Sequence, residues 1–271
     1  LRFCGDPVLK PGVLNVIKPA GATSFAVVQR LRDLTSARRV GHAGTLDSLA
    51  TGVLPVLFES ATRLSDYAHR LPKTYEADVH FGFTTDTDDA EGERHPVADP
   101  GGLTQAGVAG ALRLFTGLIS QEPPAFSAVK VDGERSYQRA RKGDLERPAA
   151  RMVEVYSAEL LSFEAGPEAV ARVRVVCGSG TYLRSLARDL GAALQVGGYL
   201  GKLVRTAYGP LRIEEGVELA SLGSGADVEA RLLASELVLP EMTPVRLTLE
   251  QEAQVRQGRP VRVLPEPGPG P

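Results

Sequence analysis

Residues 74–81, Thr-Tyr-Glu-Ala-Asp-Val-His-Phe, alternate polar and apolar side chains over their whole length. Successive side chains of a β-strand point to opposite faces of its sheet, so this alternation collects one set of side chains on one face. The apolar set consists of Tyr75, Ala77, Val79 and Phe81. The stretch therefore predicts a β-strand with one face in the protein core and the other in solvent.

Other stretches predict the strands that accompany it. Val170–Cys177 shows the same alternation, and the mostly apolar run Val13–Ile17 stops at Lys18-Pro19, where the proline ends a strand. Two further apolar stretches predict strands over Val53–Phe58 and Met152–Phe163. These segments are spread along the chain, so a sheet built from them is formed by long-range pairing.

Apolar residues at helical spacing predict the helices. Thr23 or Ser24 can cap a first helix, and its predicted apolar face consists of Phe25, Val28, Leu31 and Leu34. Further helices are expected over Thr104–Phe115, Leu183–Leu194 and Val228–Leu237. Because strands and helices alternate irregularly, we expect an α+β fold, with a mixed, mainly antiparallel sheet as core and flanking helices.

The length of the chain bounds its domain organisation. At about 150 residues per domain, 271 residues correspond to one large domain with a small appendage. We expect the large domain over residues 1–234, with an extended insertion at about 121–151. A short β-rich C-terminal domain is expected over 235–264, where Arg246–Leu264 forms the β-rich part, and residues 265–271 form a flexible Pro/Gly tail.

Composition excludes several classes of protein. No apolar run approaches the ~18 residues of a membrane span, and two cysteines cannot build a disulfide framework or a four-ligand zinc site. We therefore expect a soluble, cytoplasmic protein. The net charge is only −2, but positive charge is concentrated in residues 127–151 and 168–212, while residues 86–93 carry five acids and no cation. Basic patches of this kind are typical of a polyanion-binding face, although solvated helix and strand surfaces give the same pattern.

The sequence lacks the usual cofactor motifs. It contains neither a Gly-x-x-x-x-Gly-Lys-Ser/Thr phosphate loop nor a Gly-x-Gly-x-x-Gly turn after a strand. The four histidines show no metal-ligand spacing on a helix. We therefore expect no cofactor and no metal, and a reaction carried by side-chain nucleophiles or an acid/base pair.

The loop Gly41–Gly52 holds the best candidate for such a group. Asp47 stands among glycines and small polar residues, where backbone N–H groups can approach a carboxylate closely. Structural explanations compete with a functional one: Asp47 can form an Asx-turn or cap a helix, and His42 can be a hydrogen-bonded loop residue. Likewise Tyr75 can be a core residue and Arg184 a solvated surface arginine.

Six stretches follow one another in order within residues 12–210: Leu14–Ser24, Gly41–Gly52, Lys73–Ala77, Gln121–Lys130, Cys177–Arg184 and Leu203–Thr206. Together they resemble successive motifs of the TruB family of pseudouridine synthases. The chain departs from the usual family pattern at Ser48, where a proline is common, at Phe126, where a tyrosine is common, and at Val204, where an arginine is common.

The resemblance implies the pseudouridine synthase fold with a PUA-like C-terminal domain, and the isomerisation of uridine 55 in the tRNA T-loop without a cofactor. It implies a monomer that binds the T-arm without a guide RNA or a membrane. Catalytic roles fall on Asp47, Tyr75 and Arg184. Substrate-binding roles fall on His42, Tyr75, Tyr182 and Leu203. RNA-binding roles fall on Lys18, Lys130, Arg139, Arg141, Lys142 and Arg205.

Three alternatives make different demands on these residues. A non-catalytic RNA-binding protein or tRNA chaperone needs the basic patches but neither Asp47 nor Arg184. A guide-RNA-dependent relative would not act on bare tRNA. A glycosidase needs a second acid at a fixed separation from Asp47; Glu76 lies on the strand face opposite Tyr75, and nothing pairs Glu122 with Asp47, so we set this alternative aside.

Overall fold

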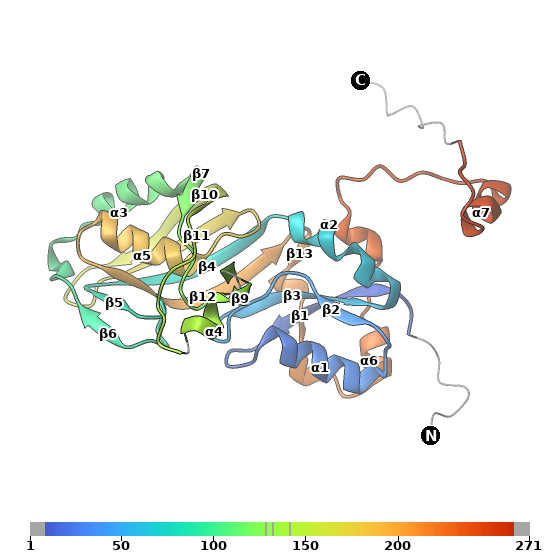
Figure 1. Ribbon diagram of the computed structural model, residues 1–271, viewed down its shortest axis with the longest axis horizontal. Coiled ribbons are helices and arrows are strands. Elements are labelled where there is room, and N and C mark those ends of the chain that lie inside the picture. The colour runs from blue at the N-terminus through green and yellow to red at the C-terminus, as the bar shows by residue number, and fades with distance from the viewer. Residues whose placement is uncertain (1–8, 128, 132, 141, 263–271) are drawn as a thin grey trace. The chain divides into compact units, whose positions relative to one another are not determined.

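The computed structural model describes residues 9–262, except 128, 132 and 141 (Figure 1). The chain divides into two compact units, Leu1–Val238 and Leu239–Pro271. The sequence analysis expected a boundary after residue 234, close to this division. Within the described residues, no helix is long and apolar enough to cross a membrane.

The first unit is built on a mixed, mainly antiparallel sheet, as the sequence predicts. Its strands follow the order β14-β1-β3-β12-β4-β11-β10-β7, with β2 added to β3 and β13 to β12. Among these pairs, β1–β14 and β3–β12 are parallel, and the others are antiparallel. The strands are β1 (Gly12–Lys18), β2 (Val40–His42), β3 (Thr51–Phe58), β4 (Lys73–Phe81), β7 (Gly117–Gln121), β10 (Arg151–Glu164), β11 (Val170–Cys177), β12 (Gly198–Tyr208), β13 (Leu211–Arg212) and β14 (Val217–Glu218).

Strand β4 lies between β12 and β11, where its alternation has the predicted effect. Tyr75, Ala77, Val79 and Phe81 are all buried, and the polar residues between them are half-buried. Two small hairpins stand outside the main sheet. They pair β5 (Phe83–Thr85) with β6 (Arg94–Pro96), and β8 (Lys130–Val131) with β9 (Glu134–Arg135).

Helices cover the sheet at two places, so the first unit has two hydrophobic clusters (Figure 1). Helix α5 (Leu183–Ala193) packs its buried stripe of Leu186, Ala187 and Leu190 against β4, β11 and β12, beside α3 (Gln105–Leu112). At the other end, α1 (Ser24–Thr35) and α6 (Gly225–Glu229) cover β1 and β3. The remaining helices of this unit are α2 (Ser65–Arg70), α4 (Ser136–Ala140) and the 3-10 segments Glu59–Leu64, Pro100–Gly102, Arg113–Phe115, Ile213–Glu215, Leu219–Ser221 and Ser235–Val238.

The predicted apolar face of the first helix is wrong at one residue. Thr23 caps α1 by accepting a hydrogen bond from the Ala26 N–H, and the helix then buries Val27, Val28 and Leu31. Phe25, in the first turn, is 68% exposed. A spacing of three residues drifts around a helix, so the start of such a series can leave the buried face.

The β-rich C-terminal domain is also wrong for the residues described. Between 239 and 262 the structure has α7 (Leu249–Arg256) and no strand. Thr248 and Gln251 form a capping box at its start, and Glu252 pairs with Arg256 one turn later, so local interactions favour a helix. The predicted helix over Val228–Leu237 is displaced as well, to α6. Residues 263–271, which include the predicted tail, lie outside the described residues.

Candidate functional site

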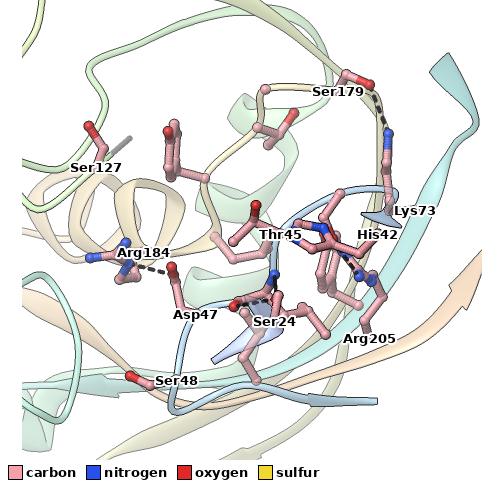
Figure 2. Close-up of a pocket in the computed structure, with 18 of the residues that line it drawn as sticks. Ser24, His42, Thr45, Asp47, Ser48, Lys73, Ser127, Ser179, Arg184 and Arg205 are labelled. Atoms are coloured by element: carbon pink, nitrogen blue, oxygen red, sulfur yellow. Dashed lines mark hydrogen bonds and ion pairs between the residues drawn. The ribbon is translucent and has the colours of Figure 1, made fainter. Parts of the chain in front are cut away.

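A cavity of about 720 Å³ opens in the first unit, where the start of α1, the loop before β3, strands β4 and β12 and the start of α5 meet (Figure 2). Its lining includes six residues that the sequence analysis assigned to catalysis or substrate binding. The fold thus brings together positions that lie far apart in the chain. These residues are His42, Asp47, Tyr75, Tyr182, Arg184 and Leu203.

Asp47 and Arg184 form an ion pair at this cavity, with 2.9 Å between Oδ2 and Nε (Figure 2). The Arg184 side chain is only 6% exposed, whereas that of Asp47 is 38% exposed. Arg184 also donates hydrogen bonds to the carbonyl oxygens of Thr87 (3.2 Å) and Phe126 (3.0 Å). The guanidinium is therefore fixed from behind, which excludes a solvated surface arginine, while the carboxylate remains accessible from the cavity.

A second carboxylate supports Arg184 from the acidic stretch 86–93. Asp89 lies with Oδ2 3.6 Å from Arg184 Nη1, and it is buried. The pKa of Asp89 is raised above its ordinary value, because the effect of burial exceeds the lowering by the Thr87 hydroxyl and Arg184. Its neighbour Asp88 is buried too and pairs with Arg188 at 2.9 Å. The sequence analysis treated this stretch as an acidic loop, and nothing in its local pattern shows that two of its acids fold inward onto arginines.

The predicted RNA contact of Lys18 is contradicted by its burial. The side chain is 0% exposed, and Nζ donates to the carbonyl oxygens of Pro19 (2.9 Å), Ala22 (2.7 Å) and Ser48 (3.2 Å). Burial lowers the pKa of Lys18 to about 8. Its role is to tie the turn after β1 to the loop that carries Asp47.

Arg205, another predicted RNA-binding residue, lines the cavity but is only 1% exposed. It donates to the carbonyl oxygens of Gly44 (2.9 Å) and Val53 (2.7 Å) and to the Tyr75 hydroxyl (3.4 Å). Gly44 and Val53 lie on either side of Asp47 in the chain. Arg205 therefore holds both ends of the Asp47 loop next to Tyr75.

Two cavity residues lie opposite each other on neighbouring strands. Tyr75 of β4 pairs in register with Arg205 of β12, and Ala77 pairs with Leu203. The Tyr75 ring is both a core residue and part of the cavity wall, because it is buried and also lines the cavity. The pKa of its hydroxyl is raised above the ordinary value, because the effect of burial exceeds the lowering by Arg205.

Several lining residues had no role assigned from the sequence. Ser24, at the start of α1, makes two hydrogen bonds with the backbone of Leu46. Its hydroxyl donates to the Leu46 carbonyl (3.1 Å) and accepts from the Leu46 N–H (2.9 Å). This contact places the first turn of α1, and so Phe25, at the cavity. Lys73 is buried and donates to the Ser179 hydroxyl at 2.8 Å (Figure 2).

Two further predicted RNA-binding residues, Arg139 and Lys142, lie outside the cavity lining. Arg139 on α4 pairs with Asp144 at 2.7 Å and with Glu146 at 2.9 Å. Lys142 follows α4 and is exposed. Lys130 belongs to β8, without a described side chain, and Arg141 lies outside the described residues. Among the described residues, no group of three or more His, Cys, Asp or Glu side chains could hold a metal ion.

Comparisons with known proteins give one consistent result. Residues 32–183 match the family model described as TruB family pseudouridylate synthase (N terminal domain). The tRNA pseudouridine synthase B of Synechococcus elongatus is 44% identical over 265 residues, which cover 95% of this chain and 88% of the relative. The protein of that name from Symbiobacterium thermophilum is 44% identical over 247 residues, covering 91% and 82%.

The fold also resembles a solved structure. A chain in the crystal structure of a Cbf5–Nop10–Gar1 complex superposes with a TM-score of 0.70 at 29% identity. The likeness covers 91% of this chain and 67% of that one. Similarity of sequence and of fold therefore both extend over most of the chain, including the segments that surround the cavity.

Proposed function

The chain belongs to the TruB family of pseudouridylate synthases, and we propose that it isomerises uridine 55 in the T-loop of tRNA, with Asp47 as the catalytic carboxylate. The single observation that supports this most is the geometry of the Asp47–Arg184 pair. A carboxylate held by a buried guanidinium, yet open to a cavity, is ready to meet a substrate atom.

The reaction makes limited chemical demands on such a site. The C1′–N1 bond of uridine breaks, the uracil turns, and C1′ joins C5, which loses its proton while N1 gains one. Atoms and electrons balance within the substrate, so the enzyme has to supply only a charged group, a base-binding pocket and a route for one proton. The Asp47 carboxylate can add to C1′ or take the C2′ proton, and its ion pair with Arg184 holds it in place.

The cavity suits a base that has left its stack. A uridine inside a folded loop must be everted, which costs a few kcal/mol. Tyr75 would stack on the everted uracil, with Tyr182 and Leu203 as further walls, because all three line the cavity with apolar surface. His42 would occupy the space that the base leaves in the RNA.

We propose that the insertion at about 121–151 grips the RNA. Shape, stacking and phosphate contacts dominate RNA recognition, and this segment combines arginines and lysines with the cavity residues Phe126, Ser127 and Tyr137. We also propose that the protein acts as a cytoplasmic monomer on tRNA alone. Its relatives at 44% identity are named as tRNA enzymes, which favours tRNA over a guide-bound substrate.

The test is pseudouridine mapping on an unmodified tRNA transcript incubated with the purified protein and nothing else. We expect modification at uridine 55, and none in a matched transcript that carries cytidine there. Modification at another uridine would contradict the proposed position. Binding without modification would favour the tRNA chaperone, and activity only after a guide RNA is added would favour the guide-dependent alternative.

A further inference from the structure

We propose that Gln121 is a positioning residue for the reaction and that it acts by fixing Tyr182 at the wall of the cavity. This inference rests on the proposed function, because it concerns the residue that would contact the uracil. Gln121 is the last residue of β7, at the edge of the main sheet, and it is 2% exposed. It does not line the cavity.

The side-chain amide of Gln121 binds both backbone groups of one residue. Oε1 accepts a hydrogen bond from the Tyr182 N–H at 2.8 Å, and Nε2 donates to the Tyr182 carbonyl at 3.1 Å. Tyr182 immediately precedes α5, and its own side chain makes no capping hydrogen bond. A backbone group at a helix start needs a partner outside the helix, and Gln121 supplies it.

A second residue holds the Tyr182 ring from the same place in the sheet. Arg151, the first residue of β10, is the register partner of Gln121. Its guanidinium carbon lies 5.1 Å from the centre of the Tyr182 ring, and Nη2 donates to the Gly180 carbonyl at 2.8 Å. One cross-strand pair thus fixes the backbone of Tyr182, its ring and the turn before it.

Besides capping the helix, these contacts would position two cavity residues for the reaction. Tyr182 and Arg184 are separated by one residue, and both line the cavity. A displacement of about 1 Å at a positioning group can cost a hundredfold in rate, because the reacting atoms lose their alignment. Gln121 connects this helix start to a strand, which is a rigid support.

The same strand end offers a matched control. The carbonyl of Glu122, the next residue, accepts hydrogen bonds from the hydroxyl of Ser185 (2.7 Å) and from Nη2 of Arg188 (3.1 Å). Ser185 is buried on α5 but does not line the cavity. Its contact with Glu122 therefore stabilises the packing of α5 without touching Tyr182.

The experiment compares Gln121→Met, which keeps the side-chain length but loses both hydrogen bonds, with Ser185→Ala. Steady-state pseudouridine formation, which gives kcat and the KM for tRNA, and thermal unfolding are measured for both. For Gln121→Met we expect kcat to fall about 10- to 100-fold, the loss of one to two buried hydrogen bonds, with little change in the KM for tRNA. For Ser185→Ala we expect Tm to fall about as much as it does for Gln121→Met, and kcat to stay unchanged.

A double-mutant cycle separates positioning from stability. If Gln121 acts through Tyr182, the effect of Gln121→Met on kcat is largely lost in a Tyr182→Ala background. An equal loss of kcat in both backgrounds, or a full kcat in Gln121→Met at a temperature where it is folded, would overturn the proposal. A wild-type protein that forms no pseudouridine would instead refute the proposed function, so the two failures are distinguishable.

Discussion

The chemistry of Asp47 follows from its unequal surroundings. On one side a nearly buried Arg184 holds its carboxylate, and on the other side the cavity leaves it 38% exposed. Arg184 is itself fixed by two main-chain carbonyls and Asp89, so it cannot follow Asp47 away from the site. The pair therefore holds the carboxylate at a fixed place, as the proposed reaction at a sugar carbon would require.

His42 should be neutral at physiological pH. Burial lowers its pKa below the ordinary 6.5, and Arg205 and His69 lower it further. We expect NMR titration of the His42 ring, assigned with a His42→Gln variant, to give a midpoint below 6.5. Between pH 6.5 and that midpoint the folded protein binds fewer protons than the unfolded chain, so stability decreases as the pH falls through this range. A midpoint above 6.5 would be inconsistent with the site described.

Phe25 should contribute to RNA binding. It is 68% exposed at the cavity, and a base stacked on an aromatic ring is worth about 1–3 kcal/mol. We expect Phe25→Ala to weaken tRNA binding at least ~5-fold by this estimate, with little change in Tm. Leu114→Ala is the control, because Leu114 is 70% exposed and does not line the cavity. Equal tRNA affinities of the two variants would refute this role.

The sequence predicts the place of some site residues but not of others. Asp47 and Tyr75 could be placed at the site, because a family resemblance and, for Tyr75, a strand alternation point to them. Asp89 could not, since an acidic run has the same pattern whether it is solvated or folded onto buried arginines. Lys18 was misassigned for a related reason: a basic residue in an RNA-binding protein suggests a phosphate contact, and only the fold shows that main-chain carbonyls accept its hydrogen bonds.

At the scale of elements, the loop that carries Asp47 depends on a close approach of two strands. Gly52, at the start of β3, has φ of +105°, and a Cβ there would overlap the carbonyl oxygen of Arg205 on β12. We expect Gly52→Ala to lower the free energy of unfolding by on the order of 3 kcal/mol, from backbone strain and overlap together.

Gly41, at the other end of this loop, provides the comparison. A Cβ at Gly41 would meet no atom within 4 Å. Gly41→Ala should therefore change the free energy of unfolding by less than ~1 kcal/mol. Denaturant titration of both variants measures the difference, and equal stabilities would show that the approach of β3 to Arg205 does not constrain the loop.

Elements were predictable where a strong period decided the structure. The alternation of β4 and β11 and the apolar stripe of α5 all appear as expected. The C-terminal segment was not predictable from its apolar content, because a capping box and a one-turn ion pair favour a helix there. The contacts of Gln121 with Tyr182 join residues 61 apart in the chain, and no local pattern reports them.

For the whole molecule, burial redistributes charge. The net charge is only −2, but the structure places Asp88 and Asp89 inside the first unit, next to arginines. Their partners Arg184 and Arg188 are largely buried with them, so these ion pairs add little net charge to the surface that meets solvent. Binding of RNA would then depend on exposed basic side chains elsewhere, such as those of the insertion at about 121–151.

The affinity for tRNA should therefore fall as salt rises, by about 0.7 to 0.9 in log–log slope for each phosphate neutralised. Arg139 is already paired with Asp144 and Glu146. We expect Arg139→Ala to reduce the slope by less than one full phosphate contact, because binding RNA exchanges one anion for another. Titrations at several salt concentrations measure this, and an affinity that does not depend on salt would rule out a basic RNA-binding face.

The most direct test of the central claim compares wild type with Asp47→Asn on one unmodified tRNA transcript, measuring pseudouridine at position 55 and tRNA affinity in parallel. The substitution keeps the size of the side chain and removes its charge. We predict unchanged tRNA binding, to within about threefold, because Arg184 keeps its contacts with two main-chain carbonyls and Asp89 when the Asp47 charge is removed. We also predict no detectable pseudouridine. Full modification by Asp47→Asn would contradict the claim that this carboxylate performs the reaction.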